Sequence, residues 1–145
     1  MQVDFYHLTR LPLDRVLPRI AERVLETGGR LLVVAGDDAL AEKIDEALWT
    51  NAPDSFLPHA RAGGDDALQP ILIGADVAAG NGARNIALAD GIWREEALDF
   101  DRAFYFFDAE SIAGARTAWR ALNGREGVEP RYWKQDEQGR WKIGP

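Results

Sequence analysis

Two arginines and a tryptophan near the end of the chain share one face of an expected helix. Arg116, Trp119 and Arg120 lie at positions i, i+3 and i+4, and Asn123 follows at i+7. Guanidinium groups bind carboxylates through two parallel hydrogen bonds, and an aromatic ring supplies apolar contact area. Together these side chains predict a site for a peptide that carries carboxylates and an apolar ring. Taken singly, Trp119 could be a core residue and the arginines a solvated rim, so that alternative stays open.

The charge of the chain reverses in the same region. Residues 1–115 carry 10 Lys and Arg against 20 Asp and Glu, whereas residues 116–145 carry 7 against 4. Three of the five tryptophans also lie in this last segment. A small basic and aromatic segment on an acidic protein suits an acidic, hydrophobic peptide better than a small metabolite. The sequence therefore predicts a protein partner.

A second group of apolar residues lies in the middle of the chain. Trp49 ends an expected helix, Phe56 follows in a loop flanked by prolines, and Leu57 and Pro58 continue that loop. A rigid loop that presents Trp and Phe loses little entropy on docking, so these residues are candidates for a protein interface. The alternative is that the two rings only pin the loop onto the core. Composition does not decide between these two interpretations.

The usual phosphate-binding loops are missing. The turn after the first expected strand has no glycine, and the turn after the second contains Asp37 and Asp38, whose carboxylates would repel a phosphate. The loop from Gly74 to Gly82 is glycine-rich, but it lacks a following lysine and a clear helical run. We therefore expect no cofactor and no functional nucleotide site. The alternative function is a degenerate nucleotide-binding hydrolase that uses this loop.

Groups for catalysis and metal binding are sparse. The chain has two histidines and no cysteine. Ser55 and His59 lie four residues apart in a proline-flanked loop, but a loop-capping serine and a partly buried or interface histidine are the favoured interpretation. Adjacent acids usually mark solvated caps and turns. The pairs at 37–38, 65–66 and 95–96 are of this kind. We expect no catalytic residues and no metal site.

The hydrophobic pattern alternates between strands and helices. This alternation favours an α/β fold of the Rossmann-like class, with an open, largely parallel sheet and helices on both faces. Strands are expected at 3–7, 30–35, 71–74, 85–89 and 102–107, and helices around 16–25, 40–48 and 111–123. Pro18 would be tolerated only in the first turn of its helix, and Gly28 suits the end of that helix. Residues 50–70 are expected to form a long loop, and 131–143 a hairpin turning near Gly139 or a partly ordered tail.

Length and charge limit the number of domains and the kinds of partner. At 145 residues and 46% hydrophobic content, a single domain spanning 1–145 is expected. A net charge of −7 disfavours direct binding of nucleic acid, because the surface would mostly repel phosphates. The N-terminal segment has no signal-peptide pattern, and no apolar run is long enough to span a bilayer. A cytoplasmic protein without membrane contact is therefore expected.

Several blocks together resemble the chi subunit of bacterial DNA polymerase III, an accessory protein of the clamp loader. They comprise FYHL at 5–8, DEALW at 45–49 with SFLPH at 55–59, the last helix with Arg116, and YWKQ at 132–135 with GRW at 139–141. These blocks span essentially the whole chain. The DEALW and SFLPH pair and the YWKQ ending are specific as a set, although each alone would be weak.

The resemblance implies a non-catalytic adaptor of the polymerase III holoenzyme with a Rossmann-like fold and no working nucleotide site. It implies that a surface including Trp49 and Phe56, with Leu57 and Pro58 beside them, binds the psi subunit or alternatively a DNA-repair helicase. It also implies that another face holds the acidic C-terminal peptide of single-stranded DNA-binding protein.

Arg116, Trp119 and Arg120 match the residues that hold this peptide in the family. The chain departs from the family pattern at Asn123, where a further basic residue is expected, and at Ala113 or Gly114 upstream. A less basic pocket with weaker affinity is therefore a second possibility.

Overall fold

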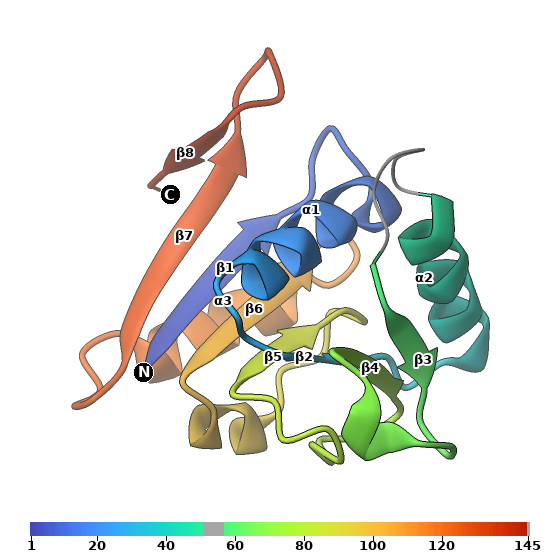
Figure 1. Cartoon of the computed structure of the whole chain (residues 1–145). Helices are drawn as coiled ribbons and strands as arrows, with labels where there is room; N and C mark the ends of the chain where they lie inside the picture. Colours follow the sequence, from blue (N-terminus) through green and yellow to red (C-terminus); the bar gives the residue numbers. More distant parts are fainter. Residues whose placement is uncertain (51–56, 145) are drawn as a thin grey trace.

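An eight-stranded sheet runs through the molecule, in the order β3-β4-β2-β5-β6-β1-β7-β8 (Figure 1). The computed structural model describes residues 1–50 and 57–144. Every neighbouring pair is parallel except β7 and β8, which are antiparallel. The strands are β1 Gln2–His7, β2 Leu31–Val34, β3 His59–Arg61, β4 Ile71–Gly74, β5 Asn85–Leu88, β6 Arg102–Phe107, β7 Glu129–Gln135 and β8 Trp141–Ile143.

Helices cover both faces of this sheet, as expected from the sequence. α1 (Leu13–Glu26) and α2 (Asp38–Thr50) pack on one face, and α3 (Ile112–Leu122) packs on the other. Two short 3-10 helices, η1 (Asp66–Leu68) and η2 (Glu95–Asp99), are also present. The α/β, Rossmann-like prediction with an open, largely parallel sheet is thus confirmed.

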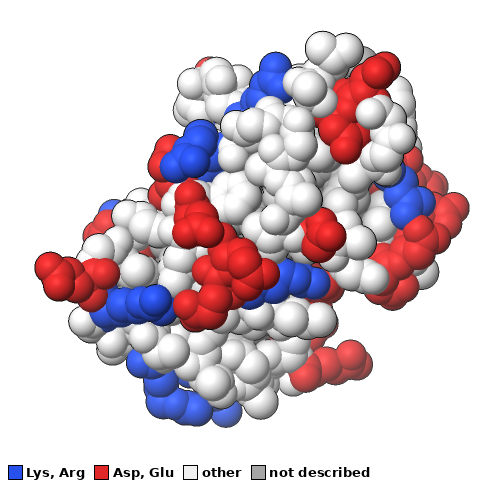
Figure 2. Space-filling model, turned by 90° about the horizontal axis from the view of Figure 1, so that it is seen from below, with Lys and Arg blue, Asp and Glu red and all other residues white. Residues whose placement is uncertain are grey.

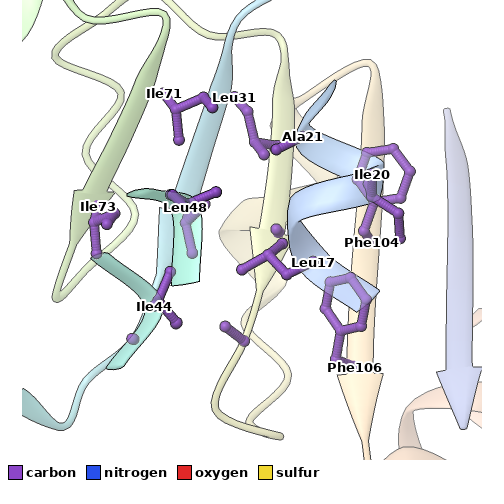
Figure 3. Packing of buried hydrophobic residues seen from close by; sticks show 14 of the residues in the cluster. Leu17, Ile20, Ala21, Leu31, Ile44, Leu48, Ile71, Ile73, Phe104 and Phe106 are labelled. Atoms are coloured by element: carbon purple, nitrogen blue, oxygen red, sulfur yellow. The ribbon is translucent and has the colours of Figure 1, made fainter. Parts of the chain in front are cut away.

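Strand alternation divides the buried side chains into two cores. In β6, Phe104 and Phe106 face α1, whereas Tyr105 and Phe107 face α3. Figure 3 shows the first core, in which side chains of α1 and α2 point toward the sheet. Burying apolar area on both faces favours the continuous hydrophobic strands seen in the sequence, such as LLVV in β2. Because both faces of the sheet are packed, the strands hold the residues at their ends and edges in fixed positions.

The first helix differs from the sequence expectation at Pro18. α1 begins at Leu13, directly after Pro12, so Pro18 lies inside the helix and the first-turn prediction was wrong. Proline has no N–H, and the Asp14 carbonyl therefore lacks its usual i+4 donor. Pro18 is buried, so packing against the core compensates for the lost bond. The end of the helix follows the prediction, because Gly28 has a φ of +80°.

The segment after α2 also differs from the expected loop. Residues His59–Arg61 form β3, an edge strand that pairs with β4. Its HAR sequence contains no β-branched or large apolar residue, so strand propensity could not reveal it. The predicted hairpin at the other edge is confirmed, since β7 and β8 pair antiparallel and Gly139 in the turn has a φ of +79°.

Candidate peptide-binding site

Small residues on α3 set the position of the helix against the sheet. Ala115, Ala118 and Leu122 are buried and form the inner face of the helix. Alanine lets the helix backbone approach the sheet closely, which leaves Arg116 and Arg120 exposed at the rim. Trp119 lies between these two faces and is half-buried. Trp119 packs against the core on this face of the sheet while part of it stays exposed, so its role in peptide binding stays a prediction.

A hollow of about 360 Å³ lies beside α3, and we call it the α3 pocket. It brings together the three side chains predicted for peptide binding and adds residues from β1 and β7. Its lining residues are His7, Phe107, Ile112, Ala115, Arg116, Trp119, Arg120, Tyr132 and Lys134.

Aromatic contacts hold Trp119 in place. Its ring meets Phe5 edge-on at a centroid distance of 5.2 Å and Tyr132 at 5.9 Å. Tyr132 also contacts Phe107 at 5.8 Å. Such perpendicular arrangements are favourable for aromatic rings, and a ring fixed by them loses little freedom when a ligand binds. The apolar part of the pocket is thus already formed before any ligand enters.

Three cations surround this apolar part. Arg116 and Arg120 come from α3, and Lys134 comes from β7. In the described part of the chain none of the three takes part in an ion pair. In a protein with a net charge of −7, such a group of unneutralised cations favours an anionic ligand. The arrangement can hold several carboxylates around a hydrophobic side chain.

His7 is held neutral at the floor of the same pocket. Burial lowers the pKa of His7, and the positive charges of Lys134 and Arg116 lower it further. Burial also raises the pKa of Tyr132, whose hydroxyl lies 3.1 Å from His7 Nδ1. A protonated Tyr132 therefore donates to a neutral His7. The ring then adds no positive charge at neutral pH but can gain one when a carboxylate approaches.

Lys134, Tyr132 and His7 were not among the residues predicted for this site. Tyr132 and Lys134 lie two apart in β7 and so point to the same face of the sheet. β1 pairs with β7 so that His7 lies opposite Lys134. The sequence signal was the alternation of side chains in the YWKQ block, which puts Tyr132 and Lys134 on one face of a strand. Only the pairing of β7 with β1 shows that this face also carries His7. Asn123 is the C-cap of α3 and lies outside the lining, so Lys134 supplies the third cation.

The second predicted surface, at the end of α2, is divided between exposed and buried residues. Trp49 is 58% exposed, and its ring lies edge-on against His59 at 4.9 Å. Leu57 is only 3% exposed and belongs to the core beneath α1 and α2. Pro58 is half-buried, and Phe56 lies outside the described residues. The interface role of these four residues stays a prediction.

Both ring nitrogens of His59 have partners within the fold. Its Nδ1 lies 2.6 Å from the Leu57 carbonyl oxygen, and its Nε2 lies 3.0 Å from Asp45 Oδ1. These contacts join the segment after α2 to the helix itself. Ser55, the possible partner of His59 in catalysis, lies outside the described residues. The burial of His59, which is 9% exposed, agrees with the predicted partly buried histidine, and its interface role stays a prediction.

The glycine-rich loop begins with Gly74 at the carboxyl end of β4, but its residues 80–82 lie at the amino edge of the sheet. Asn81 donates to the carbonyls of Leu31 and Gln69, at the beginning of β2 and the end of η1. A side-chain carbon at Gly80 would meet Asp66 at 3.2 Å. Ligands of open α/β sheets bind outside the carboxyl ends of the strands, the opposite edge. The contacts describe a structural turn beside a carboxylate.

The carboxyl edge of the sheet has a hollow of about 590 Å³. Asp90, Asp108 and Glu110 line it together with Arg10 and Lys43. The Gly36 N–H, which precedes α2 and could have met a phosphate, donates instead to Asp90 Oδ2 at 2.9 Å. Acids therefore occupy the position where a nucleotide phosphate would bind in this fold.

The paired acids have partners within the fold. Asp37 Oδ1 accepts the Ala39 N–H at the start of α2, and Asp38 forms an ion pair with Arg61. Asp66 accepts the N–H groups of Gly63 and Gly64, and Glu95 pairs with Arg125. Across 1–50 and 57–144 no three His, Cys or acidic side chains are grouped to hold a metal ion.

Charge on the surface is mixed. Figure 2 shows the face seen from below the view of Figure 1, where acidic residues form groups and basic residues lie between them rather than in one continuous patch. Such a face does not offer a track for a polyanion. Among the helices of the described residues, none is both long and apolar enough to cross a membrane.

Fold and site together define an α/β protein with a Rossmann-like sheet, an acid-lined carboxyl edge and a preformed cationic and aromatic pocket beside its last helix. A family model described as DNA polymerase III chi subunit, HolC, matches residues 1–130. The chain therefore belongs to this family of DNA polymerase III subunits, as the sequence blocks indicated.

Two curated relatives are called DNA polymerase III subunit chi. The protein of Escherichia coli K12 is 35% identical over 51 residues, which are 35% of this chain and 35% of the relative. The protein of Haemophilus influenzae Rd is 32% identical over 63 residues, or 41% of this chain and 44% of the relative. The matched segments thus span less than half of either relative.

Proposed function

We propose that this protein is a non-catalytic adaptor of the DNA polymerase III holoenzyme. One surface binds the psi subunit of the clamp loader, and another binds the acidic C-terminal peptide of single-stranded DNA-binding protein. The protein so links the polymerase to coated single-stranded DNA without contacting the nucleic acid itself. Family membership supports the polymerase assignment, and the α3 pocket supports the peptide assignment.

The α3 pocket is the observation on which this function rests. Arg116, Arg120 and Lys134 ring an apolar cleft made by Trp119 and Tyr132. An aromatic side chain of the peptide fits against the two rings, and its carboxylates pair with the cations. A small metabolite would pair with only some of these three cations.

The surface around Trp49 supports the second interface. An exposed tryptophan held edge-on against His59 is an ordered anchor, and such residues often dominate binding energy. We propose that Trp49 and Phe56, with Leu57 and Pro58 beside them, contact psi or alternatively a DNA-repair helicase. This interface lies at the end of α2, and the α3 pocket lies on the other face of the sheet, so both partners can bind at once.

Calorimetric titration tests the peptide assignment. The purified protein is titrated with a synthetic peptide of the last residues of the host single-stranded DNA-binding protein, and the same titration is made with the Arg116→Ala and Arg15→Ala variants. Arg15 is an exposed arginine on α1, away from the pocket, and serves as the matched control. We expect binding by the wild type and the control and a large loss for Arg116→Ala. Equal affinities for all three would place the peptide elsewhere.

The alternative function, a degenerate nucleotide-binding hydrolase, is tested with ATP and GTP under the same conditions. Residues 80–82 of the Gly74–Gly82 loop lie beside Asp66 and at the amino edge of the sheet, so we expect neither binding nor hydrolysis. Saturable binding of either nucleotide would favour the hydrolase.

A further inference from the structure

A second cavity with cations and aromatic rings lies on the opposite face of the sheet. It lies between α1 and the β7–β8 hairpin and has a volume of about 270 Å³. We call it the hairpin pocket. Its polar and aromatic lining consists of Tyr6, Arg19, Arg23, Arg102, Trp133 and Trp141. It shares no lining residue with the α3 pocket.

Three aromatic rings form the wall of the hairpin pocket. Tyr6 and Trp133 are nearly parallel, with centroids 6.2 Å apart and an interplanar angle of 11°. Trp141 meets Tyr6 edge-on at 5.0 Å. Both tryptophans are only half-buried, so part of each ring remains available to a ligand. This is apolar contact area of the kind that anchors a side chain from a partner.

Buried polar groups hold this wall in position. Asp4 is fully buried, and its Oδ1 accepts the Trp133 Nε1–H at 3.0 Å. Gln135 is 5% exposed, and its Oε1 accepts the N–H groups of Arg10 and Leu11 at 3.2 Å. Its Nε2 donates to the Gly139 carbonyl at 3.3 Å. The hairpin is therefore tied to the segment before α1, and the pocket is preformed.

The cations of the pocket are of two kinds. Arg102 is fixed by Asp4, with Nε at 2.9 Å and a terminal nitrogen at 2.8 Å from Oδ2. Arg19 and Arg23 lie one turn apart on α1, and no ion pair in the described part of the chain includes them. Like charges at this spacing repel each other. An anionic ligand would relieve this repulsion.

Tyr6 contributes an unused hydrogen-bond donor. The residue is only 8% exposed, yet its hydroxyl has no hydrogen-bond partner among residues 1–50 and 57–144. Burial raises the pKa of Tyr6 to about 12, with a further contribution from Asp4, so the hydroxyl stays protonated. Since no buried side-chain donor or acceptor of the described residues lacks a partner, the Tyr6 hydroxyl opens to the cavity, where an incoming carboxylate can accept its hydrogen bond.

We propose that the hairpin pocket is a second recognition site, which binds an acidic segment of a partner protein. One apolar side chain of the segment packs against Trp133 and Trp141. Neighbouring carboxylates pair with Arg19 and Arg23, and one of them accepts the hydrogen bond of Tyr6. Since it uses a different face and different residues, this site does not rest on the function proposed for the α3 pocket.

A peptide fits the pocket better than a nucleic acid or a small molecule. The arginines lie around one small cavity and form no continuous track for a polyphosphate backbone. Small-molecule sites usually have volumes of roughly 300–1,000 Å³. A cavity of about 270 Å³ is below that range and suits a single anchoring side chain. The exposed arginines at its rim then meet the acids on either side of the anchor.

The probe is a pentapeptide with a central phenylalanine, two aspartates on each side and both ends blocked. It is titrated into full-length ¹⁵N-labelled protein carrying Arg116→Ala, which removes the main cation of the α3 pocket. We expect saturable shifts of the Trp133 and Trp141 indole signals, with little change at Trp119. Arg19→Glu and Arg23→Glu should each weaken this binding at least tenfold. Arg15→Glu, one turn earlier on α1 and outside the pocket, should leave it nearly unchanged.

Three results would overturn the proposal. The first is an absence of shifts at Trp133 and Trp141 at millimolar peptide. The second is equal binding of a peptide with asparagine in place of each aspartate, which would remove the role of the arginines. The third is that a deoxythymidine oligonucleotide shifts these two signals at physiological salt while the peptide does not, which would assign the pocket to nucleic acid. Loss of binding at the α3 pocket alone would leave this test unaffected.

Discussion

Tyr132 and Trp133 are neighbours in the sequence, but their side chains lie on opposite faces of the sheet. The Tyr132 hydroxyl lies 3.1 Å from His7 Nδ1 in the α3 pocket, whereas Trp133 Nε1 donates to Asp4 in the hairpin pocket. The alternation of β7 therefore divides one short aromatic block between two cavities. Substitutions that change one cavity can be compared with substitutions in the other.

Arg116 should be the main electrostatic contact of the proposed peptide site. Arg116→Ala should weaken binding of the acidic C-terminal peptide by tens-fold or more, because loss of a charge-assisted bidentate contact costs about 2–3 kcal/mol. Arg116→Lys should recover only part of this, since an ammonium group cannot reproduce the planar fork. Higher salt should weaken the wild type by screening. Calorimetry at two salt concentrations measures all three effects.

Thr117 provides the control for this series. It is the next residue on α3, is exposed and does not line the pocket. Thr117→Ala should bind the peptide as the wild type does. An equal loss in Thr117→Ala and Arg116→Ala would indicate a general change in the helix.

Binding of the acidic peptide should take up a proton at His7. Burial, Lys134 and Arg116 hold the pKa of His7 below its ordinary value, so the free ring is neutral at pH 7. Carboxylates that enter the pocket offset the two cations, which raises this pKa in the complex. The complex thus binds more protons than the free protein, and affinity should rise as the pH falls from about 7.5 to about 5.5. Calorimetry in buffers of different ionisation enthalpy measures the uptake.

The His7→Gln variant tests the assignment of this proton. It keeps a polar side chain beside Tyr132 but cannot gain a charge in this pH range. Uptake that persists in the variant, or a proton release by the wild type, would contradict the role of His7.

Phe56 and Trp49 should act as binding anchors for psi or the helicase. Phe56→Ala should abolish binding with little change in melting temperature, because the ring is expected at an interface rather than in the core. Trp49→Ala should weaken binding in the same way, with a small loss of stability from the contact with His59. Pull-down with purified psi, together with thermal melting, separates the two effects. A large fall in melting temperature for Phe56→Ala would indicate a packing role.

Asp4 should contribute strongly to stability. It is fully buried and accepts hydrogen bonds from Gln2, Arg102 and Trp133. Asp4→Asn removes the charge and leaves donors without an acceptor, so we expect a loss of roughly 2–3 kcal/mol in the free energy of unfolding. Urea denaturation measures this loss. Asp101→Asn, in an exposed pair with Arg84, should change stability little, and equal effects would contradict the importance of burial.

Sequence patterns were sufficient for the central strands, for the three α-helices and for one side of the α3 pocket. Continuous apolar runs indicated the central strands, because strands covered on both faces must be hydrophobic throughout. Helical spacing placed Arg116, Trp119 and Arg120 on one face, since residues three and four apart are neighbours on any helix. These are local relationships, and local sequence therefore determines them.

Only the tertiary structure decided which elements meet. Pairing of β1 with β7 places His7 beside Lys134, from opposite ends of the chain, and pairing of β3 with β4 gives strand structure to a sequence of low strand propensity. Pro18 is accepted inside α1 because core packing offsets a missing hydrogen bond. The hairpin pocket needs α1, β1, β6 and the β7–β8 hairpin together. Contacts between distant segments depend on strand order and on burial in a common core, and neither is encoded within a short window of sequence.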